Sequence, residues 1–159
     1  MAEIKTFHLE DVEKTARSQR GRRLMEEANI IGGMVICGVY VVRGEGVCKI
    51  GKSRNVGARL RAHALTLMDE IPGVLHLRGI LECHPKVVDA VEVLIHWCYR
   101  DRWIKNELFR LPLDPDPLDF RSVGEVLELV ASSLGHYTLN KRRGFQCVPR
   151  PARFRRVYL

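Results

Sequence analysis

A chain of 159 residues with 46% hydrophobic side chains has the length and apolar content of one globular domain, which excludes a disordered tail. Its 26 Lys and Arg against 19 Asp and Glu give a net charge of +7. An acidic partner is therefore expected, most commonly nucleic acid, although an anionic membrane or simple solubility would explain the same charge. The longest apolar run, residues 30–42, is interrupted by Gly32, Gly33 and Gly38 and is shorter than the roughly 20 residues of a membrane helix. Because the first residues also lack the apolar core of a secretory signal, we expect a cytoplasmic protein without membrane contact.

The cysteines are odd in number and contain no CxxC pair, which argues against both a disulfide framework and a zinc ribbon. We expect reduced and mostly buried thiols. The five positions are Cys37, Cys48, Cys83, Cys98 and Cys147.

Residues 10–29 are polar and compatible with a helix, but they contain few large apolar side chains. They predict a helix that covers little of the core, so residues 1–33 are expected to form a basic N-terminal helical extension. Its basic side chains would be either solvated or in contact with phosphates, and the sequence leaves both open. They are Lys14, Arg17, Arg20, Arg22 and Arg23.

Residues 34–50 contain two β-branched runs around a glycine-containing turn, which predicts a β-hairpin. With Gly44 and Glu45 as the central turn residues, as a type II′ turn prefers, Tyr40 lies directly opposite Lys49. Cross-strand partners share one face of the sheet, so the phenol and the ammonium are expected to meet.

The next segment predicts a helix with Ser53 as its N-cap and an apolar stripe at helical spacing. Arg59 and His63 lie four residues apart beside that stripe. Pro72 and Gly73 then break the chain before a predicted strand within residues 74–83.

A second helix is predicted from Pro85 to about Trp103, with Glu92 on the edge that adjoins its inward face. Residues 106–111 (NELFRL) resemble a short strand, and the proline-rich residues 112–117 predict a loop. A last helix is expected from about Arg121 to Leu134, so residues 112–140 would pack on a core of residues 34–111.

Residues 141–159 contain seven basic residues, three interleaved aromatic residues and no acid. This pattern is typical of an arm that lies along nucleic acid, and the alternative is a solubilising tail whose aromatics pack on the domain. The basic residues are Lys141, Arg142, Arg143, Arg150, Arg153, Arg155 and Arg156, and the aromatics are Phe145, Phe154 and Tyr158.

Four stretches, GVYVV, VCKIGKSRNVGARLRAH, VEVLIH and NELFRL, occur in an order and spacing that resemble the GIY-YIG nuclease superfamily. The closer resemblance is to its phage and bacterial branch, in which the second signature reads Lys-Ile-Gly. It covers roughly residues 34–111. It implies an α/β (α+β) domain with a central three-stranded mixed sheet flanked by helices, here with basic extensions at both ends.

The resemblance also implies roles for individual side chains. Glu92 would hold one Mg²⁺ or Mn²⁺, a hard cation that keeps several waters and takes phosphate oxygens as further ligands. Tyr40 would be the general base, Lys49 would favour its phenolate, and Arg59 would clamp the phosphate. Without the resemblance, Glu92 reads as a solvated glutamate, and Tyr40 with Lys49 reads as an ordinary cross-strand pair.

Four further positions are expected to support this site. Gly38 and Gly51 would allow close approach where a side chain collides. His63 would orient a phosphate or a water, or would simply border the core. Asn106 would be a supporting polar residue, although Glu107 remains open as the functional neighbour.

The expected function is Mg²⁺-dependent, one-metal endonucleolytic hydrolysis of DNA. Basic side chains outside the reaction centre would bind the polymer. These are Lys52, Arg54 and Arg61 in the central region and Lys141, Arg142, Arg143, Arg153, Arg155 and Arg156 in the tail. The alternatives are a catalytically weak module that binds nucleic acid or a host protein, and a nuclease that acts on RNA.

Overall fold

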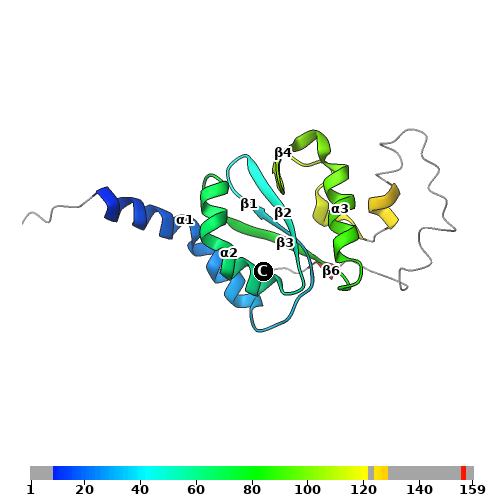
Figure 1. Cartoon of the computed structure of the whole chain (residues 1–159), viewed down its shortest axis with the longest axis horizontal. Helices are drawn as coiled ribbons and strands as arrows, with labels where there is room; N and C mark the ends of the chain where they lie inside the picture. Colours follow the sequence, from blue (N-terminus) through cyan, green and yellow to red (C-terminus); the bar gives the residue numbers. More distant parts are fainter. Residues whose placement is uncertain (1–8, 122–123, 129–154, 157–159) are drawn as a thin grey trace, which may run out of the picture.

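The computed structural model describes residues 9–121, 124–128 and 155–156, with side chains in the first helix described from Gln19 onward (Figure 1). The helices are α1 (Leu9–Ile31), α2 (Val56–Glu70) and α3 (Val88–Cys98), with short 3₁₀ helices η1 (Arg100–Arg102) and η2 (Pro117–Asp119). The strands are β1 (Gly38–Arg43), β2 (Val47–Ser53), β3 (His76–Glu82), β4 (Trp103–Lys105), β5 (Leu108–Arg110) and β6 (Arg155–Arg156).

The strands of the described residues form one sheet in the order β4-β5-β2-β1-β3-β6, and the pairs between them are antiparallel. β6 consists of two residues, so five strands make up the body of the sheet. The α+β class is confirmed, whereas the expected three-stranded mixed sheet is wrong. α2 returns the chain to the free edge of β1, where β3 runs antiparallel to β1, and the β4–β5 hairpin extends the opposite edge.

Helices cover both faces of the sheet (Figure 1). On one face, α1 and α2 bury apolar side chains such as Leu24 and Leu60 against Tyr40 and Val42. On the other face, α3 packs on Val41, Ile50 and their neighbours. Alternate residues of β1 and β2 therefore enter two separate cores.

The second half of α1 belongs to the core, so the expectation that this helix covers little of it is wrong. Leu24, Ala28 and Ile31 are almost fully buried and follow helical spacing. Buried Glu27 accepts a hydrogen bond from the backbone N–H of Leu77. Arg20 donates to the carbonyls of Met68, Ile71 and Gly73 at 3.0, 2.6 and 2.8 Å.

The β1–β2 hairpin has a different register from the predicted one. Tyr40 pairs with Gly51, and Lys49 pairs with Val42. The two-residue loop is Glu45–Gly46, because Gly46 takes the positive φ of +68° that the second turn position requires. A shift of two residues keeps Tyr40 and Lys49 on one face as diagonal neighbours.

The other predicted elements are present with different boundaries. Asn55, not Ser53, caps α2 by accepting a hydrogen bond from Ala58 N–H at 3.2 Å. α3 is shorter than residues 85–103, because η1 and β4 occupy the end of that range. Of the helix expected at 121–134, residues 124–128 are helical. Across the described ranges, no helix is both long and apolar enough to cross a membrane.

Four cysteines, Cys37, Cys48, Cys83 and Cys98, have free thiols. Cys48 and Cys83 are buried, as expected, and their burial raises the pKa of each thiol to about 12. Cys37 and Cys98 are only half-buried, and Cys147 lies outside the described residues.

Candidate functional site

Tyr40 and Gly51 are cross-strand partners whose close approach depends on the missing side chain. Tyr40 is 2% exposed. A Cβ on Gly51 would lie 2.5 Å from the Tyr40 hydroxyl and 2.6 Å from its Cζ, so the ring lies across the Gly51 backbone. At Gly38, a Cβ would collide with the carbonyl oxygen of Leu81 in β3. Both glycines thus permit contacts that a side chain would block.

The Lys49 side chain projects from β2 on the face that Tyr40 also occupies, and it reaches two carboxylates. Its Nζ lies 3.1 Å from Glu107 Oε2 and 3.7 Å from Glu70 Oε2, and its side chain is 16% exposed. Burial lowers the pKa of Lys49, but the hydrogen bond and charge of Glu107, with Tyr40 and Glu70, outweigh burial and raise this pKa. Lys49 therefore carries its charge at neutral pH.

The environment of Tyr40 favours the protonated phenol. Burial is the largest influence and raises the pKa of Tyr40. Lys49 lowers this pKa, as expected, and a hydrogen bond from Arg59 also lowers it, whereas Glu107 raises it. The net pKa lies above the ordinary value, so the expected activation by Lys49 is outweighed by burial in this structure.

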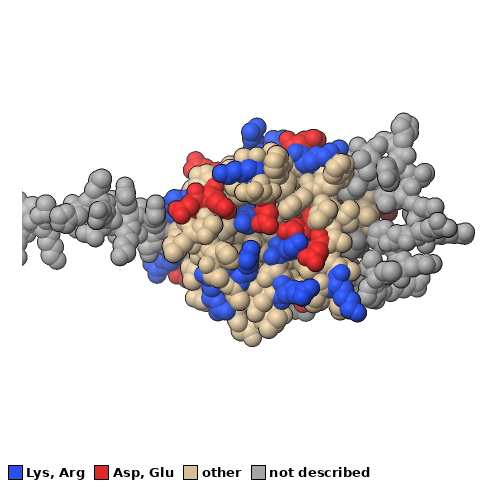
Figure 2. Space-filling model, viewed as in Figure 1, with Lys and Arg blue, Asp and Glu red and all other residues tan. Residues whose placement is uncertain are grey.

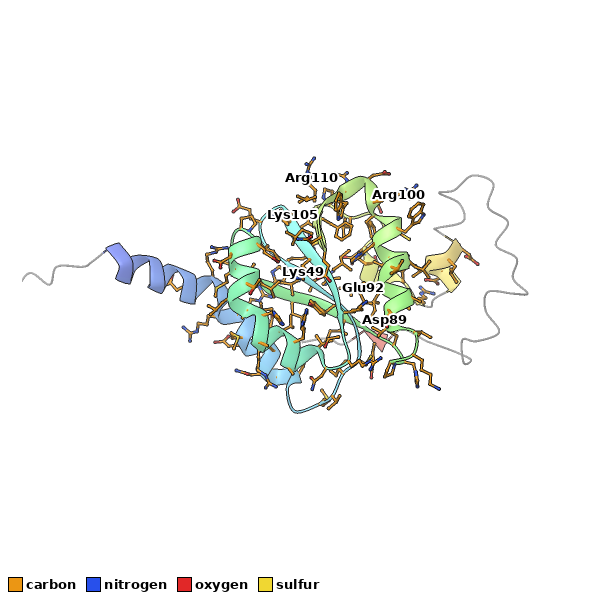
Figure 3. All side chains as sticks on the ribbon, in the orientation of Figure 1. Lys49, Asp89, Glu92, Arg100, Lys105 and Arg110 are labelled. Carbon is orange, nitrogen blue, oxygen red and sulfur yellow. The ribbon has the colours of Figure 1, made fainter. Side chains whose placement is uncertain are left out.

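Glu92 lies on α3, on the opposite side of β2, and faces the sheet (Figure 3). It is 5% exposed, and its Oε2 lies 2.9 Å from Lys52 Nζ. The same Nζ lies 3.0 Å from Asp89 Oδ1, one helical turn earlier. These two carboxylates raise the pKa of Lys52. Asp89 and Glu92 therefore share this edge of α3.

The second oxygen of Glu92 is buried and has no hydrogen-bond partner among the described residues. A buried carboxylate oxygen without a partner is costly, and a bound cation is one way to satisfy it. No group of three or more His, Cys, Asp or Glu that would form a complete metal cage occurs in the described part of the chain. The donor set fits a Mg²⁺ ion held by one or two carboxylates and otherwise by water and phosphate.

The expected site residues form two clusters around β2. Tyr40, Lys49 and Arg59 interact on the face covered by α2. Lys52 joins Glu92 on the face covered by α3. Gly51 and Lys52 are consecutive, so this strand links the two clusters. On the side in view, Lys and Arg atoms adjoin Asp and Glu atoms across the middle of the molecule (Figure 2).

His96 fixes α3 against the strand between the clusters. Its Nε2 lies 2.7 Å from the carbonyl oxygen of Ile50, and its ring centroid lies 5.0 Å from that of Phe109. Because His96 follows Glu92 by one turn of the helix, these contacts also position Glu92 beside β2.

The remaining central residues lie at various distances from these clusters. His63 is half-buried on α2, one turn after the exposed Arg59. Asn106 is an exposed turn residue with φ of +48° between β4 and β5, and its neighbour Glu107 is the one that reaches Lys49. Arg54 and Arg61 are exposed, and the Arg61 guanidinium lies against Gly32 at the end of α1.

The tail residues are mostly beyond the structural description. Arg155 and Arg156 form β6, opposite Glu82 and Leu81 of β3. Lys141, Arg142, Arg143 and Arg153, expected to bind nucleic acid, lie outside the described residues.

Sequence reasoning missed two acidic members of the clusters. Asp89 precedes Glu92 by three residues in a predicted helix, so its helical spacing was a usable signal. Glu70 reaches Lys49 only because α2 packs beside β2, and no local pattern indicates that contact.

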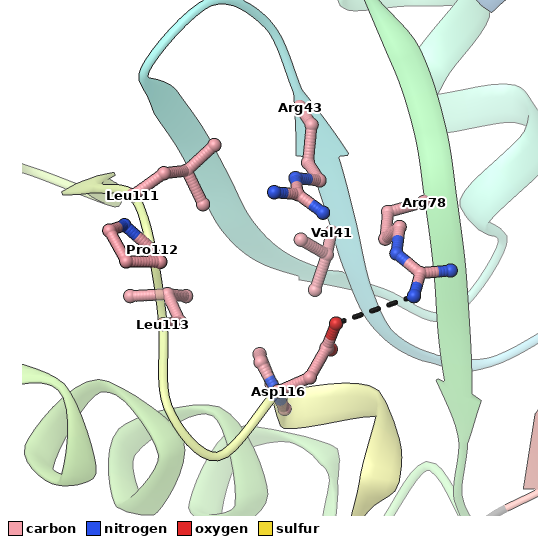
Figure 4. Close-up of a pocket in the computed structure, with 8 residues that line it drawn as sticks. Val41, Arg43, Arg78, Leu111, Pro112, Leu113 and Asp116 are labelled. Carbon is pink, nitrogen blue, oxygen red and sulfur yellow. Dashed lines mark hydrogen bonds and ion pairs between the residues drawn. The ribbon is translucent and has the colours of Figure 1, made fainter.

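A separate pocket lies between β1, β3 and the loop of residues 111–117, where Arg78 Nη2 lies 3.4 Å from Asp116 Oδ2 (Figure 4). None of the expected site residues that the structure describes lines it. It is therefore distinct from both clusters.

Comparison with known proteins adds one match. Neither the search of curated proteins nor that of solved structures gave a match to the chain. Residues 36–131, more than half of the chain, match the family model of the T5orf172 domain. These residues include both clusters around β2. The chain therefore belongs to the T5orf172 domain family, a domain related to GIY-YIG-like nuclease domains.

Proposed function

We propose that the protein is a Mg²⁺-dependent endonuclease that hydrolyses phosphodiester bonds in DNA. The observation that carries the proposal is the buried Glu92 carboxylate, which has one oxygen paired with Lys52 and the other without a partner among the described residues. The relation of the T5orf172 domain to GIY-YIG-like nuclease domains supports the same reaction class.

In this proposal Glu92 holds the metal. Asp89 either binds the same metal or keeps its ion pair with Lys52 when the metal binds. Bound Mg²⁺ would polarise the phosphate and stabilise the charge on the leaving 3′ oxygen. Lys52, one residue after Gly51, would then be available to a phosphate oxygen. An ammonium at this position adds positive charge where the transition state accumulates negative charge.

Arg59 and Tyr40 would act on the phosphate and on the attacking water. The exposed Arg59 offers a planar set of donors that suits phosphate oxygens, and it lowers the pKa of the Tyr40 hydroxyl. Tyr40 would hold the water in line and accept its proton when ionised. Since burial raises the pKa of Tyr40, the proposed reaction accelerates with rising pH.

Plasmid cleavage with Mg²⁺ or Mn²⁺ tests the proposal. We expect Glu92→Gln to reduce nicking by about a hundredfold or more, while the matched variant Glu26→Gln, which alters an exposed carboxylate on α1, retains most of it. Thermal unfolding of both variants checks that the fold persists. Equal nicking by the unchanged chain and by a folded Glu92→Gln variant would overturn the proposal, as would absence of nicking by the unchanged chain.

The second candidate is a module on the same fold that binds nucleic acid and cuts weakly. The observation that favours it is the ion pair of Lys52 with Glu92, because an ammonium on the carboxylate competes with a metal ion. Retention of DNA with negligible nicking at saturating Mn²⁺ would identify this function.

A further inference from the structure

Both tryptophans of the chain are exposed, Trp97 near the C-terminal end of α3 and Trp103 on the edge strand β4. The chain contains two Trp residues, and Trp97 and Trp103 are 41% and 57% exposed. By contrast, Tyr40, Tyr99, Phe109 and Phe120 are all buried. Large aromatic rings left exposed where the other described aromatics enter the core indicate an interaction surface.

Specific contacts hold both rings in place despite their exposure. The Arg100 guanidinium lies 4.6 Å from the centre of the Trp97 ring and donates to the Trp97 carbonyl at 2.9 Å. The Trp103 indole N–H donates to the carbonyl of Asn106 at 2.8 Å, across the β4–β5 turn. Because these bonds already restrict the rings, binding a flat ligand costs little additional side-chain entropy.

Exposed basic side chains occur at the same edge of the sheet as Trp103. Arg102 directly precedes Trp103 in the chain, and Lys105 and Arg110 are exposed on β4 and β5. Arg100, Lys105 and Arg110 lie along one border of the molecule, around β4 (Figure 3). Together with Arg100 and the two rings, these residues define the tryptophan surface. The interspersed acids are Asp101, which is exposed, and Glu107, which is paired with Lys49.

β4 is also an edge strand whose three residues are all exposed. A polymer can therefore approach this border without displacing described side chains. The excess of cations over acids favours a polyanion over an apolar protein partner.

We propose that the tryptophan surface binds single-stranded DNA. Unpaired bases expose the ring faces that stack on tryptophan, whereas bases in a duplex already stack on one another. The flanking cations would contact the phosphates between stacked bases. The choice of DNA as the ligand rests on the proposed nuclease function. If the surface binds single strands, the enzyme should preferentially cleave DNA that contains an unpaired segment.

The intrinsic tryptophan fluorescence reports directly on this surface, because no other tryptophan contributes. The full chain is titrated with an oligo(dT) and with a duplex of equal length in EDTA, where no metal-dependent cleavage occurs. We expect quenching by oligo(dT) and an affinity about tenfold higher than for the duplex.

Substitutions test whether oligo(dT) binds at the tryptophan surface. Trp103→Ala and Trp97→Ala are each expected to weaken binding of a labelled oligo(dT) about fivefold or more. Lys105→Ala should reduce the slope of the logarithm of affinity against the logarithm of salt concentration by about 0.7. Val74→Ala and Arg22→Ala, which alter an exposed apolar and an exposed basic residue elsewhere, serve as matched controls and should bind as the unchanged chain does.

The result that overturns the inference is unchanged oligo(dT) affinity in both tryptophan variants, or equal affinity for duplex and single strand. A Trp103→Ala variant that loses self-association in sedimentation but keeps its DNA affinity would assign the surface to a second copy of the chain instead. The binding titration is run in EDTA, where no metal is available and no hydrolysis occurs. Failure of the proposed hydrolysis is therefore distinguishable from failure of this binding inference.

Discussion

The hydroxyl of Tyr40 occupies the space above Gly51 that a Cβ would need, at a distance of 2.5 Å. This contact follows from the hairpin register, which makes the two residues direct partners. It places the phenol beside the backbone that leads to Lys52 and thereby to Glu92. Gly51 thus positions the ring of Tyr40.

Gly51→Ala is expected to displace the Tyr40 ring. Overpacking of this kind costs about 1–3 kcal/mol of stability, and we expect cleavage to fall at least about tenfold because the phenol moves away from the attacking water. Cleavage assays and thermal unfolding measure the two effects. Gly33→Ala is the control, because a Cβ there meets no atom within 4 Å. Full cleavage activity in Gly51→Ala would contradict the assigned contact.

Lys49 and Glu107 influence the ionisation of Tyr40 in opposite directions. Lys49→Met removes a cation that lowers the pKa of Tyr40, so this pKa should rise and the alkaline increase in cleavage should move to higher pH. Glu107→Gln removes an anion that raises the same pKa, so the increase should move to lower pH. Rate profiles against pH measure both shifts.

The phenolate absorbance of the folded protein provides a second readout that does not depend on cleavage. The chain has four tyrosines, so the spectrum of Tyr40→Phe is needed to assign the titration of Tyr40. Shifts of the same sign in Lys49→Met and Glu107→Gln would refute the electrostatic relationship.

Lys52→Met is expected to strengthen the binding of Mn²⁺ several-fold, because it removes the ammonium that pairs with Glu92. Without metal the variant should be less stable, since a buried carboxylate loses its partner, and Mn²⁺ should raise its Tm more than that of the unchanged chain. Calorimetric titration and thermal unfolding test these effects. Lys86→Met, an exposed substitution just before α3, is the control, and equal Mn²⁺ affinity in all three proteins would contradict competition at Glu92.

Arg20→Met should destabilise the protein by about 2 kcal/mol or more, because three backbone carbonyls lose a charged donor. Arg22→Met removes only an exposed ion pair with Glu26 and should change stability by less than about 0.5 kcal/mol. Urea unfolding compares the two variants. Similar losses in both would show that Arg20 does not hold the loop after α2 against α1.

The sequence by itself determined most elements of the fold that carry the candidate site. β-Branched runs around glycines predicted the β1–β2 hairpin, helical spacing predicted α2 and α3, and residues 106–111 contain β5. These signals are local, since each depends only on residues that are close together in the sequence. Motif order assigned Tyr40, Lys49, Arg59 and Glu92 to their elements, but it did not indicate that Glu92 lies on the opposite face of β2 from the other three.

Only the tertiary structure decided how these elements meet. The preference of Gly46 for a positive φ shifted the register by two residues and made Gly51, not Lys49, the partner of Tyr40. Packing of α2 beside β2 brought Glu70 to Lys49, and packing of α3 brought Glu92 and Asp89 to Lys52. The balance between burial and charge at Tyr40 also depends on long-range packing. Sequence spacing cannot determine such contacts, because the free energy of burying a charged group depends on every element that surrounds it.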